Sequence, residues 1–303
     1  MDKILQQKIT VGKKRTAKKA IIGFSVFVLL AIIGFLFWLF TGEITNAKKQ
    51  IFISSPLPIM LVQNRPVYGN EFFQRLALAE KFNVQNKSEK NLIMEVKNRL
   101  IYEHKVKRLA ASLKVPVSQN QINKAYDTYK QAVLQTSGIT VEESLEEKGI
   151  NQNYFKEEIL SFEQLNSNLA IWFNGQRNLN EKAYRTADFL MQEVNSSSTF
   201  ADIASLYSQD EDSKQFEGDL GFVELYNLLP ELQEKIDAAA SGEILLLQSS
   251  LGLHIIKIEG KNVLEGSGTP KVHLRQIFIK TSNFNSWLET QIQNYKVTSL
   301  INF

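Results

Sequence analysis

The chain has 303 residues, of which 44% are hydrophobic and 22% are charged, a balance typical of a folded protein. This length accommodates about two domains of about 100–200 residues each. The absence of cysteine excludes disulfides and thiolate chemistry, and the three histidines show no metal-binding spacing such as HExxH. We therefore expect neither a metal site nor a cofactor.

The net charge of +3 is unevenly distributed along the chain. Residues 1–20 hold seven Lys/Arg and one Asp, whereas residues 21–40 hold no charge. Since the first segment contributes +6, residues 41–303 carry a net charge of −3. A mildly acidic main part argues against nucleic acid as the principal partner.

Residues 21–40, "IIGFSVFVLLAIIGFLFWLF", form an uncharged apolar run. A helix of this length spans a hydrocarbon core of about 30 Å. The preceding basic segment, residues 1–20, favours a signal anchor with a cytoplasmic tail, by the positive-inside rule. The expected location is a bacterial cell membrane with residues 41–303 outside it, in a periplasm or beyond a single membrane. The alternatives are a buried helix of a soluble protein and, for "KKRTAKK", a nuclear or RNA-binding signal.

A tether is expected at residues 41–57, followed by a mostly helical domain at 58–177. This domain opens with a short strand, a turn and a helix capped by Asn70. The capping-box patterns "SQNQ" and "TVEE" predict the starts of two further helices, and a 3.6-residue recurrence predicts another helix after Gly149.

Short strands follow two helices in residues 178–264, which indicates a small α+β domain. The predicted helices cover 181–194 and the segment after Thr199, and the strands lie in "GFVE", "ILLLQSS" and "GLHIIKIE". Residues 265–303 are expected to add a strand in "VHLRQIFIKT", a helix at 284–294 and a strand in "KVTSLINF".

Residues 200–259 carry a series of motifs in a fixed order: "FADIASLYSQD", "EGDLGF", a proline that opens a helix, "GEI" and "GLHIIKIE". This series closely resembles the parvulin-type peptidyl-prolyl isomerase domain, with Glu217 standing where that family usually has glycine. The helical region before it is similar, more weakly, to the chaperone part of SurA-, PpiD- and PrsA-type foldases.

The resemblance implies an apolar seat for a proline ring beside polar groups that complement a twisted amide. It implies substrate-binding roles for Leu220, Phe222, Leu228 and Leu232, and catalytic roles for Asp210, Ser249, His254 and Gln276. For each leucine the alternative is ordinary core packing, and for His254 it is a structural hydrogen bond.

Parvulins begin with a strand that carries a second histidine, and no such strand precedes Lys182 here. A segment similar to that missing strand appears instead after the domain, as "LRQIFIKT" at 274–281. We predict that this strand lies beside "GLHIIKIE", with Gln276 in the place of the histidine, and that "KVTSLINF" pairs with "PIMLVQ". The fold class is therefore α+β: a transmembrane helix, a helical chaperone domain and a parvulin-like domain completed by a C-terminal strand.

These features favour a membrane-anchored extracytoplasmic folding factor that isomerises X-Pro bonds in unfolded secreted or envelope proteins. The alternative is a holdase whose parvulin module binds peptides with little or no catalysis, because Gln276 lacks a titratable ring. A third reading is a scaffold at the secretion channel.

Overall fold

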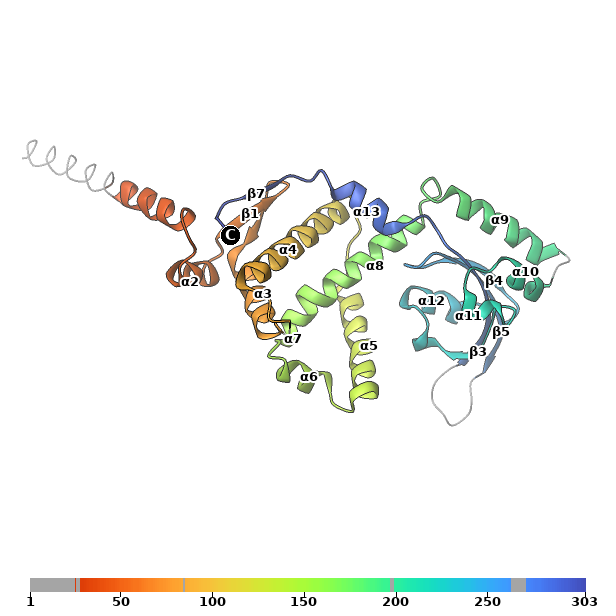
Figure 1. The fold of residues 1–303 in the computed structure, drawn as a ribbon. Helices are drawn as coiled ribbons and strands as arrows, with labels where there is room; N and C mark the ends of the chain where they lie inside the picture. The colour runs from red at the N-terminus through yellow and green to blue at the C-terminus, as the bar shows by residue number, and fades with distance from the viewer. Residues whose placement is uncertain (1–24, 26–27, 84, 197–198, 263–270) are drawn as a thin grey trace, which may run out of the picture. The chain divides into compact units, whose positions relative to one another are not determined.

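The structure is a computed structural model that describes residues 25, 28–83, 85–196, 199–262 and 271–303 (Figure 1). The chain divides into two compact units. The N-terminal unit comprises Met1–His104 with Tyr295–Phe303, and the central unit comprises Lys105–Asn294. Both helices and antiparallel strands are present, as the sequence predicts, and the domain boundaries at 57, 177 and 264 stay predictions.

A three-stranded antiparallel sheet lies in the N-terminal unit, with the order β2-β1-β7. Strands β1 (Pro58–Val62) and β2 (Arg65–Tyr68) form a hairpin whose turn residues, Gln63 and Asn64, both have positive φ. Strand β7 (Val297–Ser299) pairs with β1, which confirms the predicted pairing of "KVTSLINF" with "PIMLVQ". Strand β2 was not predicted from the sequence, and the predicted cap of the following helix at Asn70 is wrong.

The helix α3 (Gly69–Lys81) begins directly after β2, with Tyr68 as its N-cap. The close packing at this junction fixes the start, since the backbone N–H of Gly69 donates to Leu57. A Cβ at Gly69 would lie 2.7 Å from the Cβ of Phe52, so this contact requires glycine. The strand therefore runs straight into the helix, and no residue is left over for a cap at Asn70.

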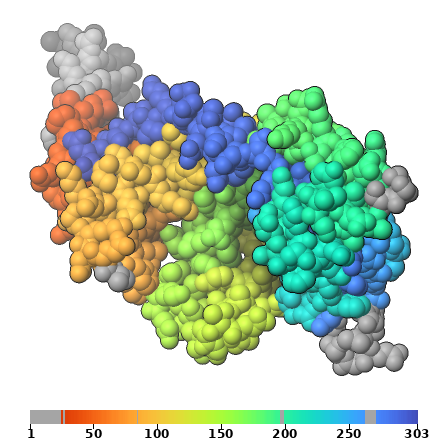
Figure 2. Space-filling model, turned by 45° about the vertical axis from the view of Figure 1, so that its right-hand side comes forward, coloured from red at the N-terminus to blue at the C-terminus, as the bar shows by residue number. Residues whose placement is uncertain are grey.

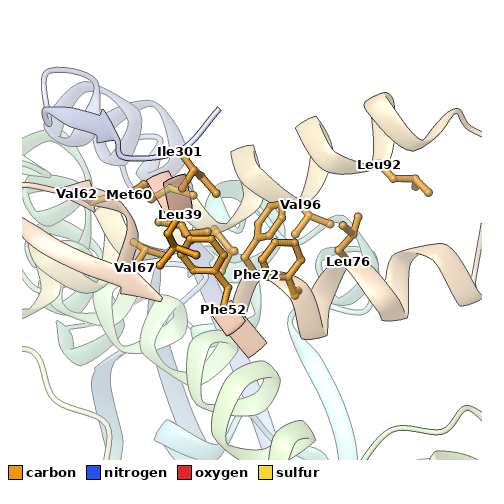
Figure 3. Packing of buried hydrophobic residues seen from close by; sticks show 13 residues of the cluster. Leu39, Phe52, Met60, Val62, Val67, Phe72, Leu76, Leu92, Val96 and Ile301 are labelled. Carbon is orange, nitrogen blue, oxygen red and sulfur yellow. The ribbon is translucent and has the colours of Figure 1, made fainter. Parts of the chain in front are cut away.

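Helix α2 (Asn46–Ser54) occupies most of the segment that the sequence predicts to be a tether, so that prediction is wrong for these residues. Thr45 caps α2, and Phe52 on it is fully buried. The core of the N-terminal unit packs around Phe52. It includes Phe72, Val96 on α4 (Glu89–Ser112) and Ile301 near β7 (Figure 3). This core turns the expected tether into part of a folded unit.

Residues 28–40 are helical and carry large apolar side chains that are mostly exposed to solvent, including Leu30, Phe37 and Trp38. Among the described residues, no helix is both long and apolar enough to meet the requirement for a membrane span. The predicted basic tail at 1–20 lies outside the described residues, as does most of the first part of the predicted span at 21–40.

The central unit begins with helices that the sequence largely predicts. Ser118 and Thr140 form the capping boxes of α5 (Gln119–Ser137) and α6 (Val141–Glu147), as expected. The predicted helix after Gly149 is present but not uniform, because a π-helical turn η1 (Phe155–Leu160) separates α7 (Gln152–Tyr154) from α8 (Ser161–Asn174).

A four-stranded antiparallel sheet forms the centre of this unit, with the order β3-β6-β5-β4. Its strands are β3 (Asp219–Glu224), β4 (Ile244–Gln248), β5 (Leu253–Asn262) and β6 (Lys271–Ile279). The helical elements around it are α9 (Glu181–Ser196), α10 (Phe200–Tyr207), α11 (Glu211–Lys214), η2 (Leu225–Asn227) and α12 (Pro230–Ala238). The last helix, α13 (Phe284–Ile292), packs against α8 instead.

Strand β6 lies between β5 and β3, which confirms the predicted position of "LRQIFIKT". Because side chains alternate along a strand, the sheet presents two different faces. On the α9 face, Ile255 and Ile277 pack with residues of α9 and α10. On the α12 face, Ile256 and Leu274 pack with Leu232 and other residues of α12.

Candidate active site

Four polar side chains form a continuous hydrogen-bonded chain on the α12 face of the sheet. Ser249 Oγ lies 2.7 Å from His254 Nε2, and His254 Nδ1 lies 3.2 Å from Gln276 Oε1. Gln276 Nε2 in turn lies 2.7 Å from Asp210 Oδ2. Neighbouring strands β5 and β6 supply His254 and Gln276, while loops supply Asp210 and Ser249. The structure thus brings together the four residues that the resemblance names as catalytic.

The donors and acceptors in this chain fit a single pattern. An ionised Asp210 only accepts, so Gln276 donates its amide N–H to Asp210 and turns its carbonyl oxygen to His254. His254 then donates from Nδ1, and its Nε2 accepts the hydroxyl proton of Ser249. The backbone N–H of Leu251 donates to the Ser249 oxygen at 3.0 Å. The network therefore holds His254 as a neutral ring in one tautomer.

The burial of His254 supports the same protonation state. Its ring is buried with 4% exposure, and burial lowers its pKa because the charged imidazolium would lose its hydration. The hydrogen bond to Gln276 and the charges of Glu231 and Asp210 act in the opposite direction but do not outweigh burial. The imidazole is therefore neutral at physiological pH.

The carboxylate of Asp210 is held in the ionised state. Burial by itself would raise its pKa, but the side chains of Ser213 and Gln276 and nearby backbone N–H groups donate hydrogen bonds that lower it overall. Ser213, which is buried, lies 2.5 Å from Asp210 Oδ2. Ser213 was not predicted from the sequence, although residues three apart in a helical turn lie close enough for their side chains to interact.

Ser208 and Phe278 also support the network and were not predicted. The backbone N–H of Phe278 donates to the buried Ser208 hydroxyl, and the N–H of Gln209 donates to the carbonyl of Phe278. The Phe278 ring lies 5.0 Å from the His254 ring. Strand alternation could have found Phe278, since residues 276 and 278 share a face.

The turn before β3 fixes the position of Gln276 along its strand. The backbone N–H of Gln276 donates to the carbonyl of Gly218 at 2.8 Å. Gly218 has a φ of +76°, and a Cβ there would lie 2.5 Å from the carbonyl oxygen of Gln276. Glycine is required here for both reasons. The preceding Glu217 has a φ of +58°, which is uncommon for a residue with a side chain.

Three of the four predicted substrate-binding residues lie on the α12 face. Leu220 and Leu228 are half-buried against its apolar cluster, and Leu232 belongs to that cluster with 4% exposure. Leu220 and Leu228 therefore offer surface to a ligand, whereas Leu232 acts mainly as the base beneath them. The substrate-binding role of all three stays a prediction.

Phe222 is not brought to these residues. It lies opposite His273 on β6, with the two rings 5.0 Å apart, and so faces away from Gln276. A β-bulge between Asp219 and Gly221 is the cause, because it interrupts the alternation that would otherwise put Leu220 and Phe222 on one face. Phe222 is 54% exposed on the opposite side of the sheet.

No group of three His, Asp or Glu side chains among the described residues is arranged to hold a metal ion. Ser249 donates to the neutral His254, but Ser249 is fully buried, so its hydroxyl is not presented to a substrate as a nucleophile. The arrangement offers a fixed row of hydrogen-bonding groups beside an apolar surface. Such a site can bind a polypeptide and stabilise a rotated amide without breaking a bond.

Residues 154–262 match the family model described as the PPIC-type PPIase domain. The chain contains a parvulin-type peptidyl-prolyl isomerase domain. The match ends before β6 begins at Lys271, so the central strand of the sheet and Gln276 lie outside the matched segment. The isomerase domain in this chain is thus completed by a strand that follows it in sequence.

No curated protein matches the chain. Among solved structures, the chain is similar to the crystal structure of foldase protein PrsA from Streptococcus pneumoniae, with 10% sequence identity. The similarity covers 73% of this chain and 79% of that chain, with a TM-score of 0.22.

Proposed function

We propose that the chain is a membrane-anchored extracytoplasmic folding factor whose isomerase domain acts on X-Pro bonds of unfolded secreted or envelope proteins. The observation that carries the proposal is the hydrogen-bonded chain from Ser249 through His254 and Gln276 to Asp210. It lies on the same sheet face as the half-buried Leu220 and Leu228.

Isomerisation of an X-Pro bond requires an apolar surface and fixed hydrogen-bonding groups, and it requires no bond cleavage. Rotation about an X-Pro bond has a barrier of about 18–20 kcal/mol, because resonance stiffens the amide. An apolar surface that binds the proline ring and fixed polar groups that suit the twisted amide lower that barrier. Because no proton is transferred, Gln276 performs the positioning role of a histidine with one donor and one acceptor.

The membrane anchor is proposed from the apolar run at 21–40 and from the exposure of its described part. Leu30, Phe37 and Trp38 present apolar surface that a bilayer would cover. Separation of cell membranes from soluble fractions, followed by extraction at alkaline pH, tests the anchor. Retention of the full-length chain in the membrane supports it, and release by alkali contradicts it.

An isomerisation assay on the full-length chain in detergent tests the catalytic role, with a short proline peptide as substrate. We expect Leu228→Ala to lower kcat/KM by about tenfold, the effect of about 1.4 kcal/mol of lost binding in the transition state. Phe222→Ala is the matched control, because it removes an exposed apolar side chain from the opposite face. Equal rates in all three proteins would contradict the proposed site.

The second candidate is a holdase that binds unfolded chains without isomerising them. The specific observation in its favour is that Gln276, an amide, stands between Asp210 and His254. Suppression of aggregation of an unfolded protein, with no isomerisation by the same preparation, would establish this alternative.

A further inference from the structure

Helix α12 is bonded to the turn between β4 and β5 through the carboxylate of Glu231. The backbone N–H of Ser250 donates to Glu231 Oε1 at 2.8 Å, and the Ser250 hydroxyl donates to the same oxygen at 3.1 Å. Glu231 stands in the first turn of α12, directly after Pro230. In the space-filling view, the teal and cyan surface of residues 210–240 adjoins the light blue surface of the later strands (Figure 2). An acidic side chain thus joins two elements that supply the candidate active site.

The bonded turn carries Ser249, the first member of the hydrogen-bonded chain. Ser249 is fully buried, and its hydroxyl lies 2.7 Å from His254 Nε2. Its backbone N–H donates to the carbonyl of Gly252 at 2.9 Å, and the N–H of Leu251 donates to its side-chain oxygen at 3.0 Å. These contacts fold the segment into a closed turn. A bond that fixes Ser250 therefore also fixes the direction of the Ser249 hydroxyl.

Helix α12 carries the apolar side of the site as well. Leu232 directly follows Glu231 and is buried in the cluster on the α12 face, and the half-buried Leu228 packs against that cluster. The side-chain amide of Gln233 donates to the carbonyl of Leu228 at 2.8 Å, which fixes the segment before the helix to the helix itself. The bond from Glu231 to the turn therefore sets the position of the apolar surface relative to the polar chain.

The charge of Glu231 also reaches the network. Burial lowers the pKa of His254, and the charge of Glu231 opposes that effect. A charge acts in this way only over a short distance, because salt screens it beyond about 10 Å. The carboxylate lies in the first turn of α12, where the helix dipole favours a negative charge. Hydrogen bonds to an ionised acceptor are about twice as strong as those between neutral groups, so this carboxylate is well suited to hold the turn.

We propose that Glu231 is a positioning residue for the isomerisation, which acts through the Ser249 turn and through α12 without touching the rotating amide. The proposal rests on the proposed function, because it assigns a part in the same reaction. Only contacts that improve as the amide twists accelerate the rotation. Such contacts need the polar groups and the apolar surface at one fixed separation, and a displacement of about 1 Å can cost about 100-fold in rate. Glu231 keeps that separation fixed.

The kinetics of isomerisation of a proline peptide by the full-length chain in detergent test this role. In Glu231→Leu the turn loses its acceptor, and we expect kcat to fall at least about tenfold with KM within about twofold, since the leucines still bind the proline ring. Glu231→Gln keeps an oxygen that accepts from Ser250, and we expect it to recover most of the lost kcat. Glu234→Leu is the matched control, because it makes the same change at an exposed position of α12, and we expect the kinetic constants of the unchanged protein.

Nuclear magnetic resonance of the three histidines gives a second measurement, which does not require activity. The signal of His254 is assigned with His254→Gln. We expect its titration midpoint to move to lower pH in Glu231→Gln, where the opposing charge is lost, and to stay unchanged in Glu234→Gln. A purely structural role of Glu231 would not produce this difference. Thermal unfolding shows whether each variant is folded.

Unchanged kcat in Glu231→Leu would overturn the proposal. A loss in Glu231→Gln as large as that in Glu231→Leu would overturn it too, because the acceptor would then not matter. If the leucine variant does not fold, equal His254 midpoints in Glu231→Gln and Glu234→Gln would still overturn it. No isomerisation by the unchanged protein would contradict the proposed function and this role with it. That failure is distinguished from a failure of this role alone, because it affects every variant alike.

Discussion

The side-chain oxygen of Gln276 lies 3.2 Å from Nδ1 of His254, on neighbouring strands of the sheet. Through this contact an amide fixes the tautomer of an imidazole, since the same amide donates to Asp210. The position of the histidine proton therefore follows from a residue that has no titratable group.

Replacement of Gln276 by leucine removes both hydrogen bonds and leaves Asp210 and His254 without a partner on that side. We expect the free energy of unfolding to fall by about 1–3 kcal/mol, the cost of leaving buried polar groups unpaired. We also expect kcat/KM for a proline peptide to fall by at least about tenfold. Gln276→His is the control, because an imidazole still offers one donor and one acceptor. A leucine variant as active and as stable as the unchanged protein would contradict a positioning role.

The stability of the central unit should depend on pH through His254. Burial lowers its folded pKa below the unfolded value of 6.5, so the unfolded chain binds more protons once the pH falls below 6.5. The free energy of unfolding is therefore highest above pH 6.5 and decreases as the pH falls toward the folded pKa. Thermal unfolding measured across this range should show a steeper loss for the unchanged protein than for His254→Gln. Parallel curves would contradict the neutral ring.

Asp210 should act in a separate and lower pH range. Its hydrogen bonds hold its folded pKa below the ordinary value of 3.8, so its contribution to stability is present above that value and is lost as the pH falls through the folded pKa. Asp210→Asn should remove this dependence, and acid unfolding curves of the two proteins measure it. If the asparagine variant loses stability over the same acid range as the unchanged protein, Asp210 is not the source of the acid dependence.

Replacement of Glu217 by glycine should stabilise the protein. Glu217 has a φ of +58°, a conformation that costs a residue with a Cβ about 1–2 kcal/mol. Relief of this strain by glycine is partly offset, because the unfolded chain is more flexible at glycine and its ordering costs about 0.5–1 kcal/mol. The contact that involves its backbone carbonyl and Arg275 is retained. We expect a net gain of up to about 1 kcal/mol in denaturant unfolding, whereas Gly218→Ala, the comparison at the next position, should be strongly destabilising.

Introduced cysteines can test the register of β6, because the chain has no cysteine of its own. Lys257 lies opposite Arg275, so the pair Lys257→Cys and Arg275→Cys should form a disulfide on mild oxidation. The control pair, Lys257→Cys with Gln276→Cys, places the two side chains on opposite faces and should not crosslink. Mobility on a non-reducing gel distinguishes them. Crosslinking of the control pair alone would show a register shifted by one residue.

The sequence predicted those features that depend on short-range patterns. The capping boxes at Ser118 and Thr140 and the alternation in "LRQIFIKT" each specify a local geometry. The resemblance to parvulins supplied the long-range placement of Gln276, which local patterns alone do not contain. The pairing of β7 with β1 was likewise predicted from the order of strands rather than from a single motif.

The predictions from sequence were wrong or incomplete where a proline, a bulge or a π-helical turn interrupts a regular pattern. Strand β2 contains Pro66, and a proline argues against a strand in sequence-based prediction. The proline is tolerated here because β2 lies at the edge of its sheet. The bulge before Gly221 moved Phe222 to the other face, and the π-helical turn at Phe155–Leu160 is invisible to a 3.6-residue count. Burial of Leu232 depends on the packing of α12, which a single sequence does not reveal.

The position of β6 after every other strand of its sheet has a consequence for biosynthesis. Strands β3 and β5 meet only through β6, so a nascent chain that has emerged as far as residue 262 carries two unpaired edges. Unpaired edges promote association between partly made chains. The folding factor is therefore itself most vulnerable to aggregation late in its synthesis, and the order of its strands makes the isomerase domain one of the last parts of the protein to become able to work.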